Sequence, residues 1–66
     1  MRTRLKVLRT EYNLGQVEMA DKLGVSIATY NRVEKGARDG SLDFWRKLDK
    51  TFNLGGEKVW EIINER

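Results

Sequence analysis

Hydrogen-bonding and basic side chains gather on one side of an expected helix between Ser26 and Gly36. At about 100° per residue, Tyr30 and Val33 point to the other side, which an apolar core would bury. The first side is short, polar and positive, carries no acid, and is formed by Ala28, Asn31, Arg32 and Lys35, with Ile27 at its flank. Such a face suits the major groove of DNA, which accepts an α-helix and whose phosphates repel carboxylates. An ordinary solvated helix face is the alternative explanation of this pattern.

The composition argues against catalytic and metal chemistry. The chain has no Cys and no His, which excludes disulfides, thiolate nucleophiles, cysteine metal sites and the commonest general base. Ten Asp and Glu residues occur, but no nucleophile, metal-ligand set or phosphate-binding loop accompanies them. We therefore expect no enzyme activity, no metal and no cofactor.

The length of 66 residues predicts one small domain spanning residues 1–66, with no room for a second domain or a doubly wound sheet. No apolar run approaches the roughly 20 residues of a membrane span. No signal peptide pattern opens the chain. These features predict a soluble cytoplasmic protein without a membrane partner.

The charge is unevenly distributed along the chain, whose net charge is +3. Residues 1–38 contain eight basic and four acidic residues, whereas residues 39–66 contain five basic and six acidic residues. A basic first half and a nearly neutral second half indicate one side that faces a polyanion and one that packs. A net charge of +3 by itself is ordinary for a soluble domain.

Apolar residues recur every three or four positions between Gly and Asn residues, which predicts an all-α chain of short helices. Five helices are expected, over residues 3–12, 16–23, 26–35, 42–52 and 57–64. Leu5, Leu8 and Tyr12 share the buried face of the first helix. The buried face of the fourth helix is expected to hold Leu42, Trp45, Leu48 and Phe52, with Phe44 off this stripe.

Polar residues at the expected helix ends support these limits. Ser26 is expected to cap the third helix by accepting a hydrogen bond from the N–H of Thr29, and Ser41 is expected to cap the fourth. Asn13 and Asn53 can adopt the left-handed conformation that ends a helix.

The most informative stretch runs from Gln16 to Gly36 and has the sequence QVEMADKLGVSIATYNRVEKG. An eight-residue helix, a short turn at Gly24 and a second capped helix form a helix-turn-helix. This stretch resembles the DNA-binding domain of phage repressors and Cro proteins and of the related small bacterial regulators. The resemblance covers about Leu5 to Ile63 and rests on Leu14-Gly15-Gln16, Met19-Ala20, Leu23-Gly24-Val25-Ser26, Thr29-Tyr30, Val33-Glu34-Lys35-Gly36 and Ser41-Leu42. It implies a five-helix repressor-like fold whose second and third helices form the helix-turn-helix.

The resemblance further implies that the helix over residues 26–35 contacts base edges in a double-stranded operator. Arg32 can pair bidentately with guanine and Asn31 with adenine, whereas Ile27 and Ala28 offer apolar surface to a thymine methyl. Because these two positions are polar in some relatives, this chain is expected to depend more on DNA shape. Phosphate contacts are implied for Gln16, Ser26, Thr29, Lys35 and Arg38.

The phosphate contacts differ in what supports them. Gln16 begins the helix over residues 16–23, where free N–H groups favour an anion, and it is also expected to brace the third helix. Thr29 contacts a phosphate or only packs. Lys35 and Arg38 are either phosphate contacts, which position a protein without specifying sequence, or generic surface cations.

An ion pair between Arg9 and Glu34 is also implied by the resemblance. It would link the end of the first helix to the end of the third. A partly buried pair of an arginine and a carboxylate fixes the orientation of helices more surely than it adds stability.

The family usually binds two-fold operators as dimers, which predicts a homodimer at least on DNA. Apolar residues in excess of what five helices can bury are the candidate interface, namely Phe44, Trp60, Ile62 and Ile63. The alternative is that all four belong to the core. We expect a transcriptional repressor, with no small-molecule effector evident.

Two other functions remain as alternatives. Antitoxins and anti-repressor partners share this fold, since a fold does not settle a function. A chain that had lost DNA binding need not keep Asn31, Arg32 and Lys35 together without an acid. RNA-binding modules usually expose stacking aromatic residues, whereas the aromatic residues here fall mostly on the expected core stripes.

Overall fold

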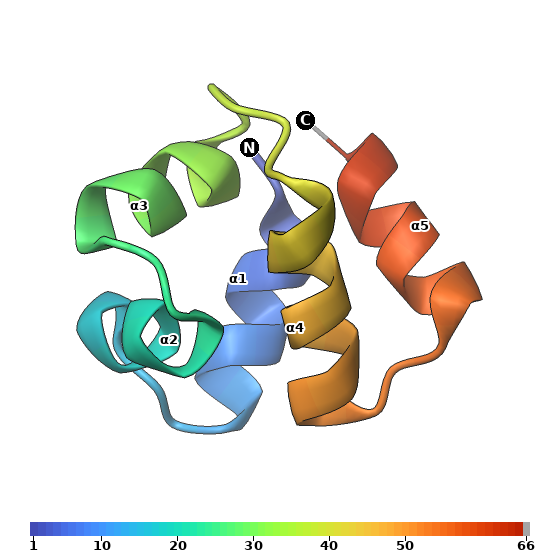
Figure 1. The fold of residues 1–66 in the computed structure, drawn as a ribbon, viewed down its shortest axis with the longest axis horizontal. Coiled ribbons are helices and arrows are strands. Elements are labelled where there is room, and N and C mark those ends of the chain that lie inside the picture. The colour runs from blue at the N-terminus through green and yellow to red at the C-terminus, as the bar shows by residue number, and fades with distance from the viewer. Residues whose placement is uncertain (66) are drawn as a thin grey trace.

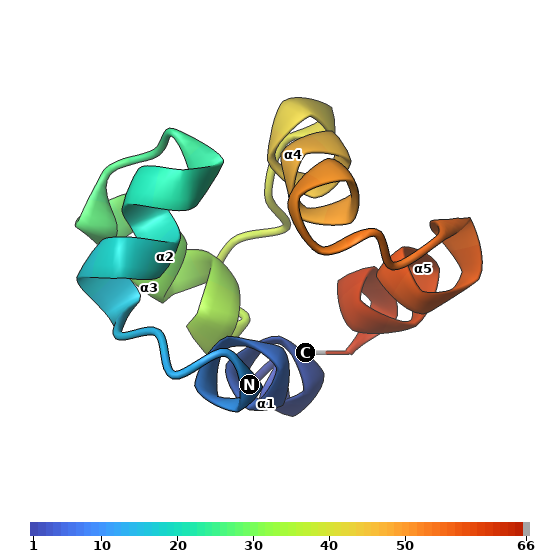
Figure 2. The same ribbon diagram turned by 90° about the horizontal axis from the view of Figure 1, so that it is seen from below.

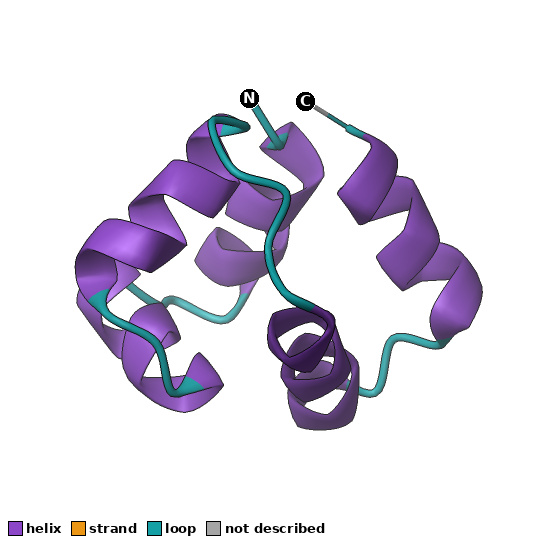
Figure 3. Ribbon diagram, turned by 45° about the horizontal axis from the view of Figure 1, so that its top comes forward, coloured by secondary structure: helices purple, strands orange, loops and turns teal. Residues whose placement is uncertain are grey.

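The computed structural model describes residues 1–65, which form five α-helices and their connecting loops, with no strand among them (Figures 1 and 3). The helices are α1 (Thr3–Glu11), α2 (Gln16–Leu23), α3 (Ile27–Lys35), α4 (Leu42–Phe52) and α5 (Gly56–Asn64). The expected all-α, five-helix class is confirmed. No helix in this part of the chain is long and apolar enough to cross a membrane.

At the N-termini of α2, α3 and α4, a side chain accepts a hydrogen bond from a backbone N–H three residues away. Ser26 Oγ and Ser41 Oγ each accept a hydrogen bond at 3.1 Å from the backbone N–H three residues further on. Gly15 has no side chain, so α2 has half of a capping box, in which Glu18 Oε1 accepts from the N–H of Gly15 at 3.2 Å. These bonds satisfy backbone groups that a helix leaves without partners at its N-terminus.

Left-handed residues follow the first four helices: Asn13 (φ 56°), Gly24 (φ 67°), Gly36 (φ 83°) and Asn53 (φ 52°). The chain then folds back on the helix it has left. After α1, the N–H of Leu14 donates to the carbonyl of Arg9 at 3.1 Å. At the ends of α1, α2 and α3 this geometry satisfies carbonyl groups of the last turn. The left-handed Asn13 and Asn53 confirm the helix ends expected there.

The helices enclose one apolar core. α2 packs on both α3 and α4, α1 packs on α3, and α5 packs on α4, as Figure 2 shows. The two ends of the described chain lie close together, and the N–H of Arg4 donates to Glu65 Oε1 at 2.6 Å. Every helix contributes to the core, which is formed by Leu5, Met19, Ala20, Leu23, Tyr30, Val33, Phe44, Trp45, Leu48, Val59 and Ile62.

The buried face of α4 differs from the expected one. Leu42 is 67% exposed and Phe44 only 2%, so the assignment of Leu42 to the core and of Phe44 to the surface is wrong. Phe44, Trp45 and Leu48 share one arc of the helix, and Leu42 lies about 60° beyond its edge. Within this arc Phe44 is directed toward α3, because its ring centroid lies 6.2 Å from that of Tyr30. Phe44 also meets its neighbour Trp45 edge-on, with the ring centroids 4.8 Å apart.

The end of α1 also differs from the expectation. α1 ends at Glu11, and Tyr12 is exposed rather than part of a buried stripe. Its ring centroid lies 4.7 Å from that of Phe52. Because the chain turns at Asn13, Tyr12 lies against the rim of the core and not within it.

Asp49 positions the start of α5. Its Oδ1 accepts a hydrogen bond from the N–H of Gly55 at 2.9 Å. Gly55 precedes α5 with a φ of 89°, which glycine adopts without strain. Asp49, a side chain of α4, therefore fixes the turn from which α5 begins.

The loop between α3 and α4 is held from its inner side by two side chains. Trp45 Nε1 donates to the carbonyl of Asp39 at 2.9 Å, and Arg2 Nη1 donates to the carbonyl of Arg38 at 2.6 Å. Gly40 has a φ of 81°, and a Cβ at this residue would lie 2.9 Å from Trp45 Nε1. Both the conformation and the close approach require glycine.

Gly40→Ala is therefore expected to lower the free energy of unfolding by about 1–3 kcal/mol, because a left-handed alanine is strained and the indole of Trp45 is held in place. Gly56→Ala is the matched control, since its Cβ would meet no atom within 4 Å. This change is expected to be neutral or to stabilise the chain by up to about 1 kcal/mol. Urea denaturation followed by circular dichroism measures both, and equal effects would contradict the prediction.

Candidate nucleic-acid interface

α2 and α3 form a helix-turn-helix at one end of the molecule, opposite α5 (Figure 1). The left-handed Gly24 ends α2, and the N–H of Val25 reaches back to the carbonyl of Ala20 at 3.0 Å. Ser26 then caps α3. The turn is therefore determined by residues of the turn itself, and core contacts position both helices.

The outward face of α3 holds the side chains expected to contact bases. Ile27, Ala28 and Arg32 are exposed and Asn31 is half-buried, whereas the opposite side of α3 is buried in the core. The four residues line one shallow hollow of about 280 Å³ together with Gln16 from α2. The structure thus brings all four and Gln16 to one surface.

The surface of α3 is positively charged. The acidic residue of this helix, Glu34, is 2% exposed. Arg32 and Lys35 are exposed in the last turn. A polyanion such as DNA is therefore attracted to this face and meets no carboxylate of α3 there.

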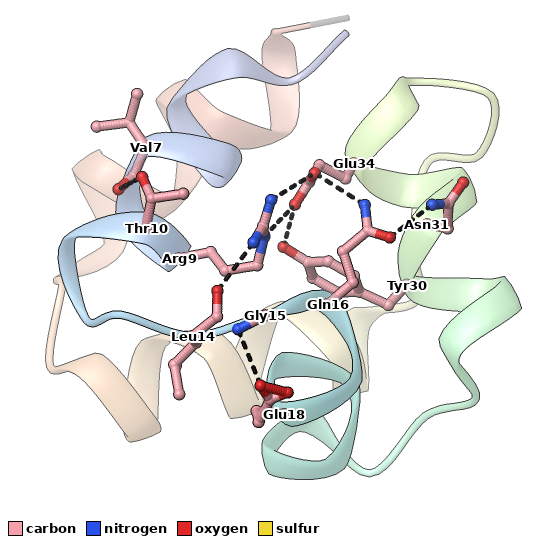
Figure 4. Close-up of polar contacts among 10 residues, drawn as sticks. All are labelled: Val7, Arg9, Thr10, Leu14, Gly15, Gln16, Glu18, Tyr30, Asn31 and Glu34. Carbon is pink, nitrogen blue, oxygen red and sulfur yellow. Dashed lines mark hydrogen bonds and ion pairs between the residues drawn. The ribbon is translucent and has the colours of Figure 1, made fainter.

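Glu34 is the centre of a buried hydrogen-bond network (Figure 4). Arg9 of α1 donates from Nε to Glu34 Oε2 at 3.0 Å and from Nη2 to Oε1 at 3.3 Å. The hydroxyl of Tyr30 donates to Oε2, and Gln16 Nε2 donates to Oε1 at 3.3 Å. The expected pair of Arg9 and Glu34 is present in the structure and joins α1 to α3, and Gln16 extends the network to α2.

Gln16 carries this network to the outward face (Figure 4). Asn31 Nδ2 donates to Gln16 Oε1 at 2.9 Å, while the amide nitrogen of Gln16 is bound to Glu34. Asn31 uses one amide hydrogen in this bond and keeps the other, together with Oδ1, for an external partner. The side chain of Asn31 is thus oriented before any partner binds.

The network determines the charge states of its members. Burial favours the neutral form of Glu34, but hydrogen bonds from Arg9, Tyr30 and Gln16 outweigh burial and hold the pKa of Glu34 below its usual value. Burial, and then the hydrogen bond to Glu34, raises the pKa of Tyr30. The hydrogen bond to Glu34 raises the pKa of Arg9. At neutral pH the carboxylate of Glu34 is therefore charged, and Arg9 and Tyr30 are both protonated donors.

Acid is expected to destabilise the chain partly through Glu34. Its pKa is lower in the folded than in the unfolded chain, so its contribution is complete above the unfolded pKa of about 4.3 and is lost as the pH falls through the folded pKa. Urea denaturation at a series of acidic pH values measures this loss of stability. Glu34→Gln does not titrate, so its free energy of unfolding is expected to depend less on pH. Parallel pH curves for the two proteins would contradict this prediction.

A second group of candidate contacts lies beside α3. Two of them, Thr29 and Arg38, line a groove of about 360 Å³ between α3 and the start of α4. Ser26 Oγ donates to Thr29 Oγ1 at 3.0 Å, so the hydroxyl hydrogen of Thr29 stays free for a phosphate oxygen. Lys35 and Arg38 are exposed and add two cations on this side, where the exposed Asp39 also lines the groove.

Sequence reasoning missed two contributors to the site. Arg2 is 0% exposed and donates from Nη1 to the carbonyl of Val33 at 2.7 Å, at the end of α3. Tyr30 was expected only as a core residue, but its hydroxyl holds Glu34. The spacing of Tyr30 and Glu34, one helical turn apart, is the signal that could have revealed their contact. Arg2 has no such signal, because its partner is 31 residues away.

The residues expected at a dimer interface separate into two groups. Phe44 and Ile62 are buried in the core of the chain. They are not available to a second copy, and this part of the expectation is wrong. Trp60 is 64% exposed and Ile63 is half-buried, and both line a groove of about 170 Å³ between α4 and α5.

Known proteins resemble the chain over nearly its whole length. The helix-turn-helix domain family matches residues 1–61. An uncharacterized HTH-type transcriptional regulator of Methanocaldococcus jannaschii is 40% identical over 60 residues, which are 91% of this chain and 91% of the relative. Two uncharacterized HTH-type transcriptional regulators of Archaeoglobus fulgidus are 37% and 40% identical over 65 residues, which are 98% of this chain and 92% and 93% of the relatives.

No solved structure matches the chain significantly. The family match includes all of α2 and α3 and their turn. The relatives are aligned over almost their entire lengths, so the likeness is not confined to one motif. The chain therefore belongs to the helix-turn-helix domain family of transcriptional regulators.

Proposed function

We propose that the chain is a sequence-specific regulator of transcription that inserts α3 into the major groove of an operator. The observation that carries this proposal is the outward face of α3, where four candidate base contacts surround one hollow and the acid of the helix is buried. On an ordinary solvated helix face, the surface side chains need not be held in place by hydrogen bonds to buried residues. Here Asn31 is held by Gln16, and Gln16 by Glu34, as a base-contacting side chain requires.

The proposed contacts follow from side-chain chemistry. Arg32 donates to O6 and N7 of guanine, and Asn31 exchanges two hydrogen bonds with adenine. Ile27 and Ala28 pack on thymine methyl groups. Around them, phosphate contacts are made by Gln16, Thr29, Lys35 and Arg38. The phosphate contact expected of Ser26 is not part of this proposal, because its hydroxyl hydrogen is already donated to Thr29 Oγ1.

We propose repression as the outcome of binding. A domain that occupies a promoter excludes polymerase without any further contact, whereas activation requires an additional surface that recruits it. In vitro transcription from a template that carries the operator tests this directly. Transcript levels that fall with increasing protein support repression, and levels that rise contradict it.

Selection from random duplex DNA tests the function itself. We expect a near-palindrome whose half-sites lie about one helical turn, 10–10.5 base pairs, apart. Titration of the selected duplex over a salt series is expected to give a slope of about −0.9 for each phosphate contact in a plot of log affinity against log salt. A duplex of the same composition in scrambled order is the control.

Failure of the selection would be informative. If no sequence is enriched and the weak binding that remains is abolished by salt, the regulator function is wrong. The alternative of an antitoxin or anti-repressor type then becomes the leading hypothesis. A search for a protein partner would be the next experiment.

We propose that a second copy of the chain covers the groove between α4 and α5. Leu42 and Trp60, two exposed apolar side chains, both line this groove. Arg46 and Asp49 line it as well, so a two-fold axis can pair the arginine of one copy with the aspartate of the other. A dimer would also supply the two α3 helices that a two-fold operator requires.

Trp60→Lys is expected to weaken dimer formation by about 2 kcal/mol or more, because an aromatic anchor is replaced by a charge. Analytical ultracentrifugation measures the change in mass, and titration of half-site and full operators separates dimerisation from DNA contact. Half-site affinity is expected to persist. Val7→Lys, an exposed apolar position on α1, is the control. Equal masses and equal operator affinities for the two variants would exclude this interface.

A further inference from the structure

The guanidinium of Arg2 lies inside the molecule, with 0% exposure. Its Nη1 donates to the carbonyls of Val33 at 2.7 Å and Arg38 at 2.6 Å, and its Nη2 donates to the carbonyl of Ile63 at 3.2 Å. The guanidinium carbon lies 5.4 Å from the centroid of the Trp45 ring. One side chain therefore contacts α3, the loop that follows it, α4 and α5.

Two helices direct their C-terminal ends at this cation. Val33 lies in the last turn of α3 and Ile63 in the last turn of α5. The carbonyl of Val33 also accepts a hydrogen bond from the N–H of Gly36 at 3.1 Å. Carbonyls at a helix end carry the negative end of the helix dipole, so a cation there is stabilised. Asp39 Oδ1 lies 3.9 Å from Nη2, further than any of the three carbonyls. Since a buried charge is costly without such partners, the position of Arg2 depends on α3 and α5 being in place together.

The bond to Arg38 connects the buried cation to the outward surface. Its carbonyl accepts from Arg2 on the inner side of the loop, while the Arg38 side chain is exposed and lines the groove that Thr29 also lines. The same part of the loop is held by Trp45, which donates to the carbonyl of Asp39. The carbonyl of Arg38 is thus held by Arg2 and the next carbonyl by Trp45, while the N–H of Arg38 donates to the carbonyl of Arg32 at 3.2 Å.

We propose that Arg2 is a positioning residue for DNA binding that acts through Arg38 and does not itself touch DNA. It places Arg38 so that its side chain reaches a phosphate, and it anchors the C-terminal end of α3 against α5. The inference rests on the proposed DNA-binding function. Arg2 supports the phosphate contact at the end of α3, whereas the network of Glu34 supports Gln16 and Asn31.

Two substitutions of Arg2 and one control test the proposal. Arg2→Lys keeps the charge but has a single nitrogen, which cannot reach three separate carbonyls as a planar guanidinium does. Arg2→Gln removes the charge as well. Arg4→Gln is the matched control, because Arg4 is exposed and its side chain contacts Glu61 and Glu65 instead of the loop. Circular dichroism first confirms that each variant keeps its helix content.

The measurement is the salt dependence of binding to the duplex selected with the wild-type chain. Arg2→Lys and Arg38→Ala are each expected to make the slope of log affinity against log salt shallower by about 0.9, the value of one phosphate contact. The double variant is expected to have the slope of Arg38→Ala alone, because the contact that Arg2 positions is already absent. A merely structural role would lower the folded fraction and leave the slope unchanged.

Three results would overturn the role of Arg2: an unchanged slope in Arg2→Lys, additive losses in the double variant, or a loss of slope in Arg4→Gln equal to that in Arg2→Lys. Loss of helix content in both Arg2 variants would also overturn it, since Arg2 would then support the whole fold and not the position of Arg38. A wild-type chain that binds no duplex overturns the proposed function itself. That failure is distinct from normal wild-type binding with additive slopes, which overturns only the role of Arg2.

Discussion

Glu34→Ala is expected to lower the free energy of unfolding by about 3–5 kcal/mol, the usual effect of removing one partner of a buried ion pair. The substitution leaves the guanidinium of Arg9, the hydroxyl of Tyr30 and the amide of Gln16 without their common acceptor. A domain of this size has a total stability of only about 3–10 kcal/mol. Urea denaturation is therefore expected to find a much lower midpoint for this variant, and at the lower end of the range much of it is unfolded before any denaturant is added.

Two further variants test whether the loss of stability comes from the hydrogen-bond network of Glu34. Glu11→Ala removes an exposed carboxylate at the end of α1 and is expected to change the stability by less than about 0.5 kcal/mol. Arg9→Ala removes the other partner of the pair and is expected to displace α3, lowering both DNA affinity and Tm more than Lys22→Ala on the exposed side of α2. Equal effects of Arg9→Ala and Lys22→Ala would show that the network does not position α3.

Arg32→Ala is expected to weaken discrimination at one base position of each half-site by about 1–3 kcal/mol, because a bidentate contact to guanine is lost. Arg32 is exposed and no buried group depends on it, so the stability of the chain is expected to stay nearly unchanged. Competition between the selected duplex and its single-base variants measures the loss. The effect should be confined to the guanine that Arg32 contacts.

Lys35→Ala is the matched control for Arg32→Ala, since it removes an exposed charge from the same helix. A phosphate contact carries no sequence information. This change is therefore expected to weaken binding to all duplexes equally and to reduce the salt slope by about 1. If Arg32→Ala also weakens all duplexes by one factor, Arg32 is a phosphate contact and the base contact assigned to it is wrong.

The helices and most of their limits could be predicted from the sequence, because the causes are local. Ser26 and Ser41 bind the backbone three residues further on, and Asn13 and Gly36 turn the chain directly after a helix. Each of these signals lies within one helical turn of its effect. Their interpretation requires no knowledge of the rest of the fold.

The outward face of α3 could be predicted for a related reason. Tyr30 and Val33 are apolar enough to identify the buried side, and the helical period then places Asn31 and Arg32 on the other. The same method was wrong for α4, where it placed Leu42 in the core. Periodicity identifies an apolar stripe, but the direction of a stripe depends on which neighbours the helix meets, and Phe44 is turned toward Tyr30.

The sequence by itself therefore determined the five helices, the serine caps of α3 and α4, the helix-turn-helix and the candidate DNA-facing residues of α3. Only the tertiary structure decided what supports that face. Glu34 gathers side chains from three helices, and Arg2 binds carbonyls 31, 36 and 61 residues away. A charged residue can be buried only where distant backbone groups or countercharges converge on it. A pattern within a short stretch of sequence does not reveal that convergence.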